Sequence, residues 1–206
     1  MYIVFEGVVG TGKTTQSQRL AEWLQKLFPE RPVVWTREPG GTEIAQAIRK
    51  LVQATPFEEE MDPICEAYLY AASRAQAISK IIKPCLKRGG IVVSDRSFIT
   101  SLAYQGYARC AGIGNIWKIN RQALSGIFPN MVIFLDLDVE TALSRSFDVS
   151  GDKWEKQGVA FFRKVREGYL TISRGSMFRE CWYTISALGE EDDVFDNIYC
   201  AISACI

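Results

Sequence analysis

The segment that points most directly to chemistry is Gly7-Val8-Val9-Gly10-Thr11-Gly12-Lys13-Thr14. It matches the phosphate-loop pattern G-x-x-x-x-G-K-[ST] without a mismatch. In such a loop the glycines let backbone N–H groups point inward, and the helix that follows adds its positive end to the anion site. We expect Lys13 to reach the β- and γ-phosphates of a nucleotide and Thr14 to place its hydroxyl on Mg²⁺. The motif therefore predicts nucleotide binding, without naming a second substrate.

The residue types available for catalysis are limited, because the chain contains no histidine. This excludes imidazole bases, histidine metal sites and histidine-dependent triads. Phosphoryl transfer suits the remaining carboxylates, cations, hydroxyls and amides, since it depends on positioning and charge stabilisation more than on proton shuttling. Asp95 follows a predicted strand, where its carboxylate could hold a Mg²⁺-bound water or orient Arg96 through a salt bridge.

Composition and charge favour small-molecule partners. Of 206 residues, 48% are hydrophobic and 23% charged, and Lys+Arg and Asp+Glu both total 24. This balance gives no net field to attract polyanions, so no nucleic-acid partner is expected. No apolar run approaches the ~20 residues that span a bilayer, and residues 1–5 lead directly into the phosphate loop. We therefore expect a cytoplasmic protein with no membrane partner and six free cysteines.

Short apolar runs alternate with longer helical patterns, which predicts an α/β fold. The predicted strands span residues 2–5, 33–36, 91–94, 131–137 and 182–186. Continuous apolar runs are typical of strands buried on both faces, so we expect a five-stranded parallel sheet with helices on both faces, the three-layer fold of P-loop NTPases. The predicted helices span residues 13–28, 62–89, 138–146, 159–174 and 192–206. Pro84 is expected to kink the second helix.

The loops that carry charged residues all follow predicted strands, and parallel sheets bind ligands beyond the carboxyl ends of their strands. The phosphate loop, the Arg37 loop and the Asp95-Arg96 loop are therefore expected to meet in one crevice. The polar segment 147–157 is the best candidate for a small lid within a single domain spanning residues 1–206.

Three further segments carry a family resemblance. They are Thr36-Arg37-Glu38-Pro39-Gly40-Gly41-Thr42, Asp95-Arg96-Ser97 leading into Ser101-Leu102-Ala103-Tyr104-Gln105-Gly106, and Leu69-Tyr70-Ala71-Ala72-Ser73-Arg74. Together with the phosphate loop, they resemble bacterial thymidylate kinases, in the right order and through nearly the whole chain. The resemblance implies Mg²⁺-dependent transfer of the γ-phosphoryl group of ATP to dTMP, which yields dTDP, by a homodimer.

The resemblance also implies a role for individual residues. The catalytic set is Lys13, Arg37, Asp95, Arg96 and Lys153, and Mg²⁺ is expected at Thr14 and Asp95. ATP is expected on Gly7, Val8, Val9, Gly10, Thr11, Gly12, Lys13, Thr14, Thr15 and Arg145. The acceptor is expected on Glu38, Arg49, Tyr70, Arg74, Arg96, Ser101, Tyr104 and Gln105. Arg49 and Arg96 would grip its phosphate, because a guanidinium can fork onto phosphate oxygens, while Tyr70 would lie against the base.

The chain departs from the family pattern at Val9 and Gly10, where most members carry an acidic residue or an arginine, and in a lid with only Arg145 and Lys153. We therefore expect reduced turnover with retained nucleotide binding. Two alternatives stay open. A deoxynucleoside kinase would need a general base near the phosphate loop, for which Glu6 is the one candidate. A degenerate kinase would bind nucleotides without transferring phosphate.

Overall fold

The computed structural model describes residues 1–53, 58–145 and 157–206, which form a parallel α/β fold. The strands are β1 (Tyr2–Glu6), β2 (Val33–Arg37), β3 (Ile91–Asp95), β4 (Met131–Asp136) and β5 (Trp182–Ser186). They form a five-stranded sheet in the order β2-β3-β1-β4-β5, and all four pairings are parallel. The predicted sheet is confirmed, with each boundary within one residue of the expected one.

The central strand β1 brings the phosphate loop to the same edge of the sheet as the neighbouring loops. Every residue of β1 and β3 is buried, which explains why both read as continuous apolar runs. Phe5 pairs with Asp95 of β3 and with Ile133 of β4, and Arg37 of β2 also pairs with Asp95. Because the strands are parallel, their carboxyl ends and the loops that follow them lie side by side.

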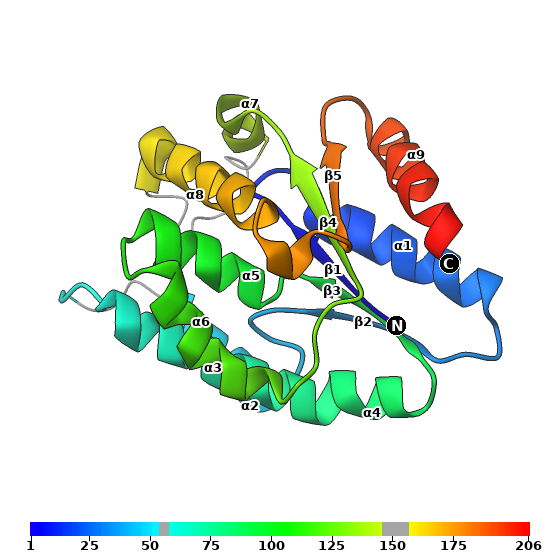
Figure 1. Cartoon of the computed structure of the whole chain (residues 1–206), viewed down its shortest axis with the longest axis horizontal. Helices are drawn as coiled ribbons and strands as arrows, with labels where there is room; N and C mark the ends of the chain where they lie inside the picture. The colour runs from blue at the N-terminus through cyan, green and yellow to red at the C-terminus, as the bar shows by residue number, and fades with distance from the viewer. Residues whose placement is uncertain (54–57, 146–156) are drawn as a thin grey trace.

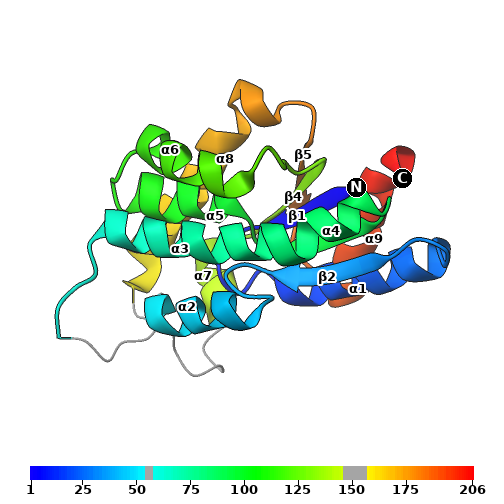
Figure 2. The same ribbon diagram turned by 90° about the horizontal axis from the view of Figure 1, so that it is seen from below.

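Helices cover both faces of the sheet (Figure 1). The α-helices are α1 (Lys13–Leu27), α2 (Glu43–Gln53), α3 (Pro63–Ala77), α4 (Lys83–Lys87), α5 (Phe98–Ser101), α6 (Ile113–Leu124), α7 (Val139–Ser144), α8 (Gly158–Ser173) and α9 (Glu191–Ile202). Helices α1 and α9 pack together on one face, and α3, α6 and α8 lie on the other. Figure 2 shows α2 running along the outside of α3. Within the part of the chain that the structure describes, none of the helices has the length and apolar character needed to span a bilayer.

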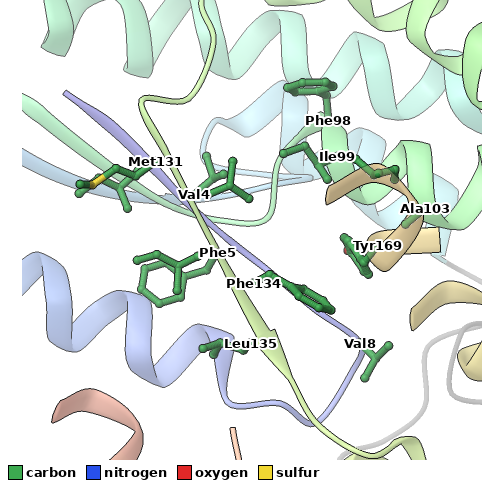
Figure 3. Packing of buried hydrophobic residues seen from close by; sticks show 14 of the residues in the cluster. Val4, Phe5, Val8, Phe98, Ile99, Ala103, Met131, Phe134, Leu135 and Tyr169 are labelled. Atoms are coloured by element: carbon green, nitrogen blue, oxygen red, sulfur yellow. The ribbon is translucent and has the colours of Figure 1, made fainter. Parts of the chain in front are cut away.

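Aromatic side chains fill the core between the sheet and its helices. Phe134 of β4 lies beside Tyr169 of α8, with ring centroids 5.2 Å apart (Figure 3), and also packs on Trp182 of β5 at 5.6 Å. Phe5 lies on the opposite face of the sheet, on the side covered by α1. Both phenylalanines are almost fully buried, so the strands that carry the site loops are held from both sides.

The helical segment after Asp62 differs from its prediction. The N-cap is as expected, since Asp62 accepts hydrogen bonds from the N–H groups of Ile64 and Cys65. A single helix was expected, but α3 passes into a π-helical turn, η1 (Ile78–Ile82), before the short α4. Pro84 follows this turn after Lys83, and a proline lacks the N–H that would continue the regular ladder.

The second π-helix and helix α6 have no counterpart in the predicted elements. The π-helix η2 (Leu102–Ala108) extends α5 and carries residues expected to contact the acceptor. In α6 the buried residues are Ile116, Asn120 and Leu124, spaced four apart, which is a helical signal. Short 3₁₀ turns η4 (Ser176–Phe178) and η5 (Ser203–Cys205) complete the elements.

Candidate functional site

A cavity of about 840 Å³ lies at the carboxyl ends of the strands and brings the predicted loops together. The predicted site residues that line it are Val9, Gly10, Thr11, Gly12, Lys13, Thr14, Thr15, Arg37, Glu38, Arg49, Tyr70, Arg74, Asp95, Arg96, Ser101, Tyr104, Gln105 and Arg145. Gly7 and Val8, also predicted to bind ATP, are not among the lining residues: Val8 is buried in the core, and the carbonyl of Gly7 accepts a hydrogen bond from Arg96. The predicted Lys153 and the lid up to residue 156 lie outside the described residues.

The phosphate loop takes the curved form that its glycines allow. Gly10 has φ +78, and a Cβ placed there would lie 1.8 Å from the carbonyl oxygen of Ala142. Only glycine therefore fits between the loop and α7. Helix α1 begins at Lys13 directly after the loop, and Gly12 to Thr15 all line the cavity, so the positive end of this helix faces it.

Lys13 is the cation held inside the loop. Its Nζ donates hydrogen bonds to the carbonyl of Val8 and, at 3.2 Å, to the hydroxyl of Thr11. Burial, together with the nearby Arg96 cation, lowers the pKa of Lys13 to about 7, although the charges of Asp95 and Glu6 oppose this shift. A ligand carrying negative charge would reverse this shift, because an anion close to the ammonium stabilises its charged form.

Thr14 and Asp95 meet across the cavity floor as a hydroxyl and carboxylate pair. The hydroxyl of Thr14 donates to Oδ2 of Asp95 at 2.6 Å. Oδ1 of Asp95 is buried and has no hydrogen-bond partner among the described residues. Oxygen ligands of this kind fit Mg²⁺, which keeps most of its water and is bound through one or two protein oxygens and substrate phosphates.

Arg96 occupies a strained position directly after β3. Its φ of 75 is in the left-handed region, which non-glycine residues rarely adopt away from functional sites. Its guanidinium donates to the carbonyl of Gly7 at 3.2 Å and lies over the ring of Tyr104, 5.5 Å from the centroid. These contacts hold the Arg96 side chain against the phosphate loop.

Beneath Arg96, Glu6 forms a buried network that sequence reasoning missed as a structural element. Its carboxylate accepts hydrogen bonds from the hydroxyls of Ser97 at 2.6 Å, Thr100 at 2.6 Å and Tyr169 at 2.9 Å. Burial raises the pKa of Glu6, while the bonds from Ser97 and Thr100 oppose the rise. The network joins β1 to the segment after β3 and to α8, so it fixes the loop that carries Arg96.

Two more arginines reach the same part of the cavity. Arg37 ends β2, and its Nε is buried with no hydrogen-bond partner among the described residues. Arg49 on α2 donates to the carbonyl of Pro39 at 3.0 Å. With Arg96, these residues give three guanidinium groups from separate elements that line one cavity. Such a cluster is suited to a phosphate group, which accepts paired hydrogen bonds from guanidinium.

Helix α3 and η2 form another part of the cavity wall. Tyr70 and Arg74 are one turn apart on α3 and are buried at 7% and 3% exposure. Nε of Arg74 donates to Glu38 at 2.6 Å, and its Nη2 lies 3.4 Å from the hydroxyl of Ser101. Burial raises the pKa of Glu38, and the charge of Arg74 opposes this rise. The buried ion pair with Glu38 fixes the guanidinium of Arg74 at the wall of the cavity.

The loop between β5 and α9, together with the start of α9, forms a further part of the cavity wall, which was not predicted from the sequence. Ala187, Gly189, Glu190, Glu191 and Val194 line it. Arg145 extends toward this loop from the end of α7 and donates to the carbonyl of Ala187 at 3.0 Å. The loop follows a strand like the other site loops, so the rule that placed those loops could have found it.

Comparison with known proteins places this arrangement in a family. The thymidylate kinase family model matches residues 5–198. A thymidylate kinase of Prochlorococcus marinus (strain NATL2A) is 39% identical over 208 residues, covering 100% of this chain and 97% of that protein. One from Pelotomaculum thermopropionicum is 44% identical over 174 residues, covering 84% and 79%. The crystal structure of thymidylate kinase from Ehrlichia chaffeensis superposes with a TM-score of 0.80 at 28% identity, covering 98% of each chain.

Proposed function

The chain belongs to the thymidylate kinase family, and from this membership and its cavity we infer that it phosphorylates dTMP to dTDP with ATP as the phosphoryl donor. The observation that carries the inference is the position of three arginines, Arg37, Arg49 and Arg96, in the same cavity as the phosphate loop. One end of the cavity offers backbone amides and Lys13 to a polyphosphate. The other offers guanidinium groups to a monophosphate.

In the proposed complex, the phosphate loop and Lys13 bind the phosphates of ATP, and Arg145 and the loop after β5 contact its nucleoside. Arg49 and Arg96 bind the phosphate of dTMP, with Arg37 beside them. Tyr70 packs against the thymine, and Arg74, Ser101 and Gln105 bind its polar edge. This arrangement aligns the acceptor oxygen with the γ-phosphate, and orientation of this kind supplies much of the catalysis in phosphoryl transfer.

Thr14 and Asp95 are the residues proposed to hold Mg²⁺, directly or through water, because the hydroxyl and the carboxylate adjoin at the end of the phosphate loop. When bound, Mg²⁺ would neutralise charge on the phosphate oxygens. Lys13 and Arg96 contribute positive charge to the same region from the protein itself, and the burial of Lys13 strengthens its effect.

The position of Glu6 disfavours a deoxynucleoside kinase. That activity would need a base to remove a proton from a sugar hydroxyl. Glu6 is 0% exposed, and its carboxylate accepts bonds from Ser97, Thr100 and Tyr169. A carboxylate engaged in this way acts as an internal support for the Arg96 loop.

ADP release measured with a panel of nucleoside monophosphates and with thymidine tests the function. We expect dTMP to be the preferred acceptor and thymidine to give no turnover. Arg49→Lys should raise the KM for dTMP by about tenfold or more with little change in the KM for ATP, because lysine loses the forked contact to phosphate. Arg31→Lys, at the amino end of β2, is the matched control and should leave both values unchanged.

A preference for thymidine over dTMP would contradict the proposed function, and binding of both substrates without ADP formation would identify a degenerate kinase. The homodimer, the cytoplasmic location, the lid at residues 147–157 and a turnover reduced by Val9 and Lys153 stay predictions.

A further inference from the structure

The side-chain amide of Gln105 is held from behind by Glu66. Nε2 of Gln105 donates to Oε1 of Glu66 at 2.7 Å, and the two residues are only 1% and 0% exposed. A carboxylate that is paired with a guanidinium accepts hydrogen bonds and does not donate them, so the amide nitrogen must face Glu66. The carbonyl oxygen of the amide is therefore directed away from Glu66.

Glu66 is itself anchored through its second oxygen. Nη1 of Arg109 donates to Oε2 of Glu66 at 3.0 Å, and Nη2 of Arg109 reaches Glu60 at 2.9 Å and the carbonyl of Met61 at 3.0 Å. The carboxylate is thus fixed at both oxygens and cannot turn without breaking the ion pair. The orientation of the Gln105 amide therefore depends, through Glu66, on where Arg109 lies.

The side-chain carbonyl oxygen of Gln105, Oε1, accepts no hydrogen bond from the described residues. Oε1 is buried and has no hydrogen-bond partner in the part of the chain that the structure describes, and Gln105 lines the cavity. Buried polar atoms are almost always paired, so an unpaired acceptor at a cavity wall indicates a donor on the ligand. Arg74 lines the same cavity, and its guanidinium can only donate. Four of its five N–H groups donate to Glu38, Asn120, Ser97 and Ser101, which leaves one, on Nη1, for a ligand. The pocket therefore offers one acceptor and one donor to the edge of a base.

We propose that Glu66 is a positioning residue that sets base selectivity by holding Gln105 with its acceptor toward the cavity. Thymine and uracil carry an N–H at position 3 and a carbonyl at position 4, which complement the amide oxygen and the guanidinium. Cytosine carries an acceptor and an amino group at these positions, so it would place acceptor against acceptor at Gln105 and donor against donor at Arg74. The inference rests on the proposed function, which it deepens.

The Glu66→Gln variant tests the proposal, because glutamine keeps the shape but both donates and accepts, and so lets the Gln105 amide turn either way. We expect the ratio of kcat/KM for dTMP to that for dCMP to fall by about tenfold or more. The fall should come from a higher KM for dTMP and faster turnover of dCMP, with the KM for ATP unchanged. Glu60→Gln is the matched control. It removes the other carboxylate that pairs with Arg109, and because the Glu60 side chain is 87% exposed, the change should leave the ratio unchanged.

A folded Glu66→Gln enzyme that keeps the parent ratio, or that slows equally with both acceptors, would overturn the proposal. Should the variant not fold, the parent protein decides by NMR: the Gln105 side-chain amide protons must exchange slowly with solvent and show contacts to Glu66, and fast exchange refutes the claim. A parent enzyme that does not phosphorylate dTMP contradicts the proposed function instead. Equilibrium affinities for dTMP and dCMP in parent and variant would then decide the role of Glu66.

Discussion

At the scale of single residues, the site contains buried charges whose properties depend on a ligand. Lys13 and Asp95 are buried, at 6% and 3% exposure, and the charges of Arg96, Asp95 and Glu6 all act on the Lys13 ammonium. A polyphosphate would add negative charge beside Lys13 and offset the solvation that the buried ammonium has lost.

The pKa of Lys13 leads to a measurable linkage. Burial lowers this pKa to about 7, so Lys13 is cationic below this pH and increasingly neutral above it. Bound phosphates favour the ammonium, so ATP binding at about pH 8 should take up most of a proton, and the affinity should fall as pH rises through 7. Calorimetry in buffers with different ionisation enthalpies measures this uptake. Lys13→Arg stays charged and should show none; equal uptake in the two proteins would rule out Lys13 as the source.

At the scale of elements, helix α3 contributes both to the cavity wall and to the core. It carries Glu66, Tyr70 and Arg74 at intervals of four residues, which places them on one face of the helix. All three are buried, and they meet η2, where Gln105 lies. The helix must start at the right residue for this face to meet the cavity, which gives its N-cap a functional consequence.

Removing that N-cap should destabilise the protein without touching the ligand contacts. Asp62 accepts hydrogen bonds from Ile64 N–H at 2.8 Å and Cys65 N–H at 3.2 Å. Asp62→Ala should lower the free energy of unfolding in urea by about 0.5–2 kcal/mol, because both N–H groups lose their acceptor. Asp62→Asn retains the cap and should retain most of the stability. Equal losses in the two variants would show that the charge, and not the cap, stabilises α3.

At the scale of the whole molecule, the sheet aligns loops that are far apart in the chain. The carboxyl ends of β1, β2 and β3 adjoin in register, which brings the phosphate loop, Arg37 and Arg96 to one cavity. The helices on both faces hold this edge rigid through the aromatic core around Phe134 and Tyr169. The positions of the side chains at the site therefore depend on how the core beneath the sheet edge is packed.

Phe134 gives a direct measure of that packing. It is 1% exposed and contacts the rings of Tyr169 and Trp182. Phe134→Ala should lower the free energy of unfolding by about 3–5 kcal/mol, since it leaves a cavity between β4, β5 and α8. Leu188→Ala, at a side chain that is 66% exposed, should change it by less than about 0.5 kcal/mol. Denaturant titrations of both variants provide the comparison, and a loss below 1 kcal/mol at Phe134 would contradict the packing argument.

Local features of the sequence were enough to determine the elements that carry the phosphate loop. The apolar runs predicted the central strands β1, β3 and β4 because a buried parallel strand needs no polar face. The edge strands β2 and β5 are less buried and were predicted from their β-branched and aromatic residues. The motif from Gly7 to Thr14 predicted the phosphate loop, because the backbone of such a loop is shaped by residues that are adjacent in the sequence. The expectation that Arg37 and Arg96 meet also followed, since both come directly after parallel strands.

Only the tertiary structure decided which buried partners hold the site residues. Glu6 bonds to Tyr169 across 163 positions of the chain, and Glu66 bonds to Gln105 across 39. Neither pair leaves a periodic signal, because a buried carboxylate and its donor need only the right distance in space. The π-helical form of η2, which places Gln105 opposite Glu66, likewise depends on packing between helices that local propensity does not describe. The sequence by itself thus determined the chemistry and the edge of the sheet where it occurs, and the packing of distant segments determined how each side chain is oriented there.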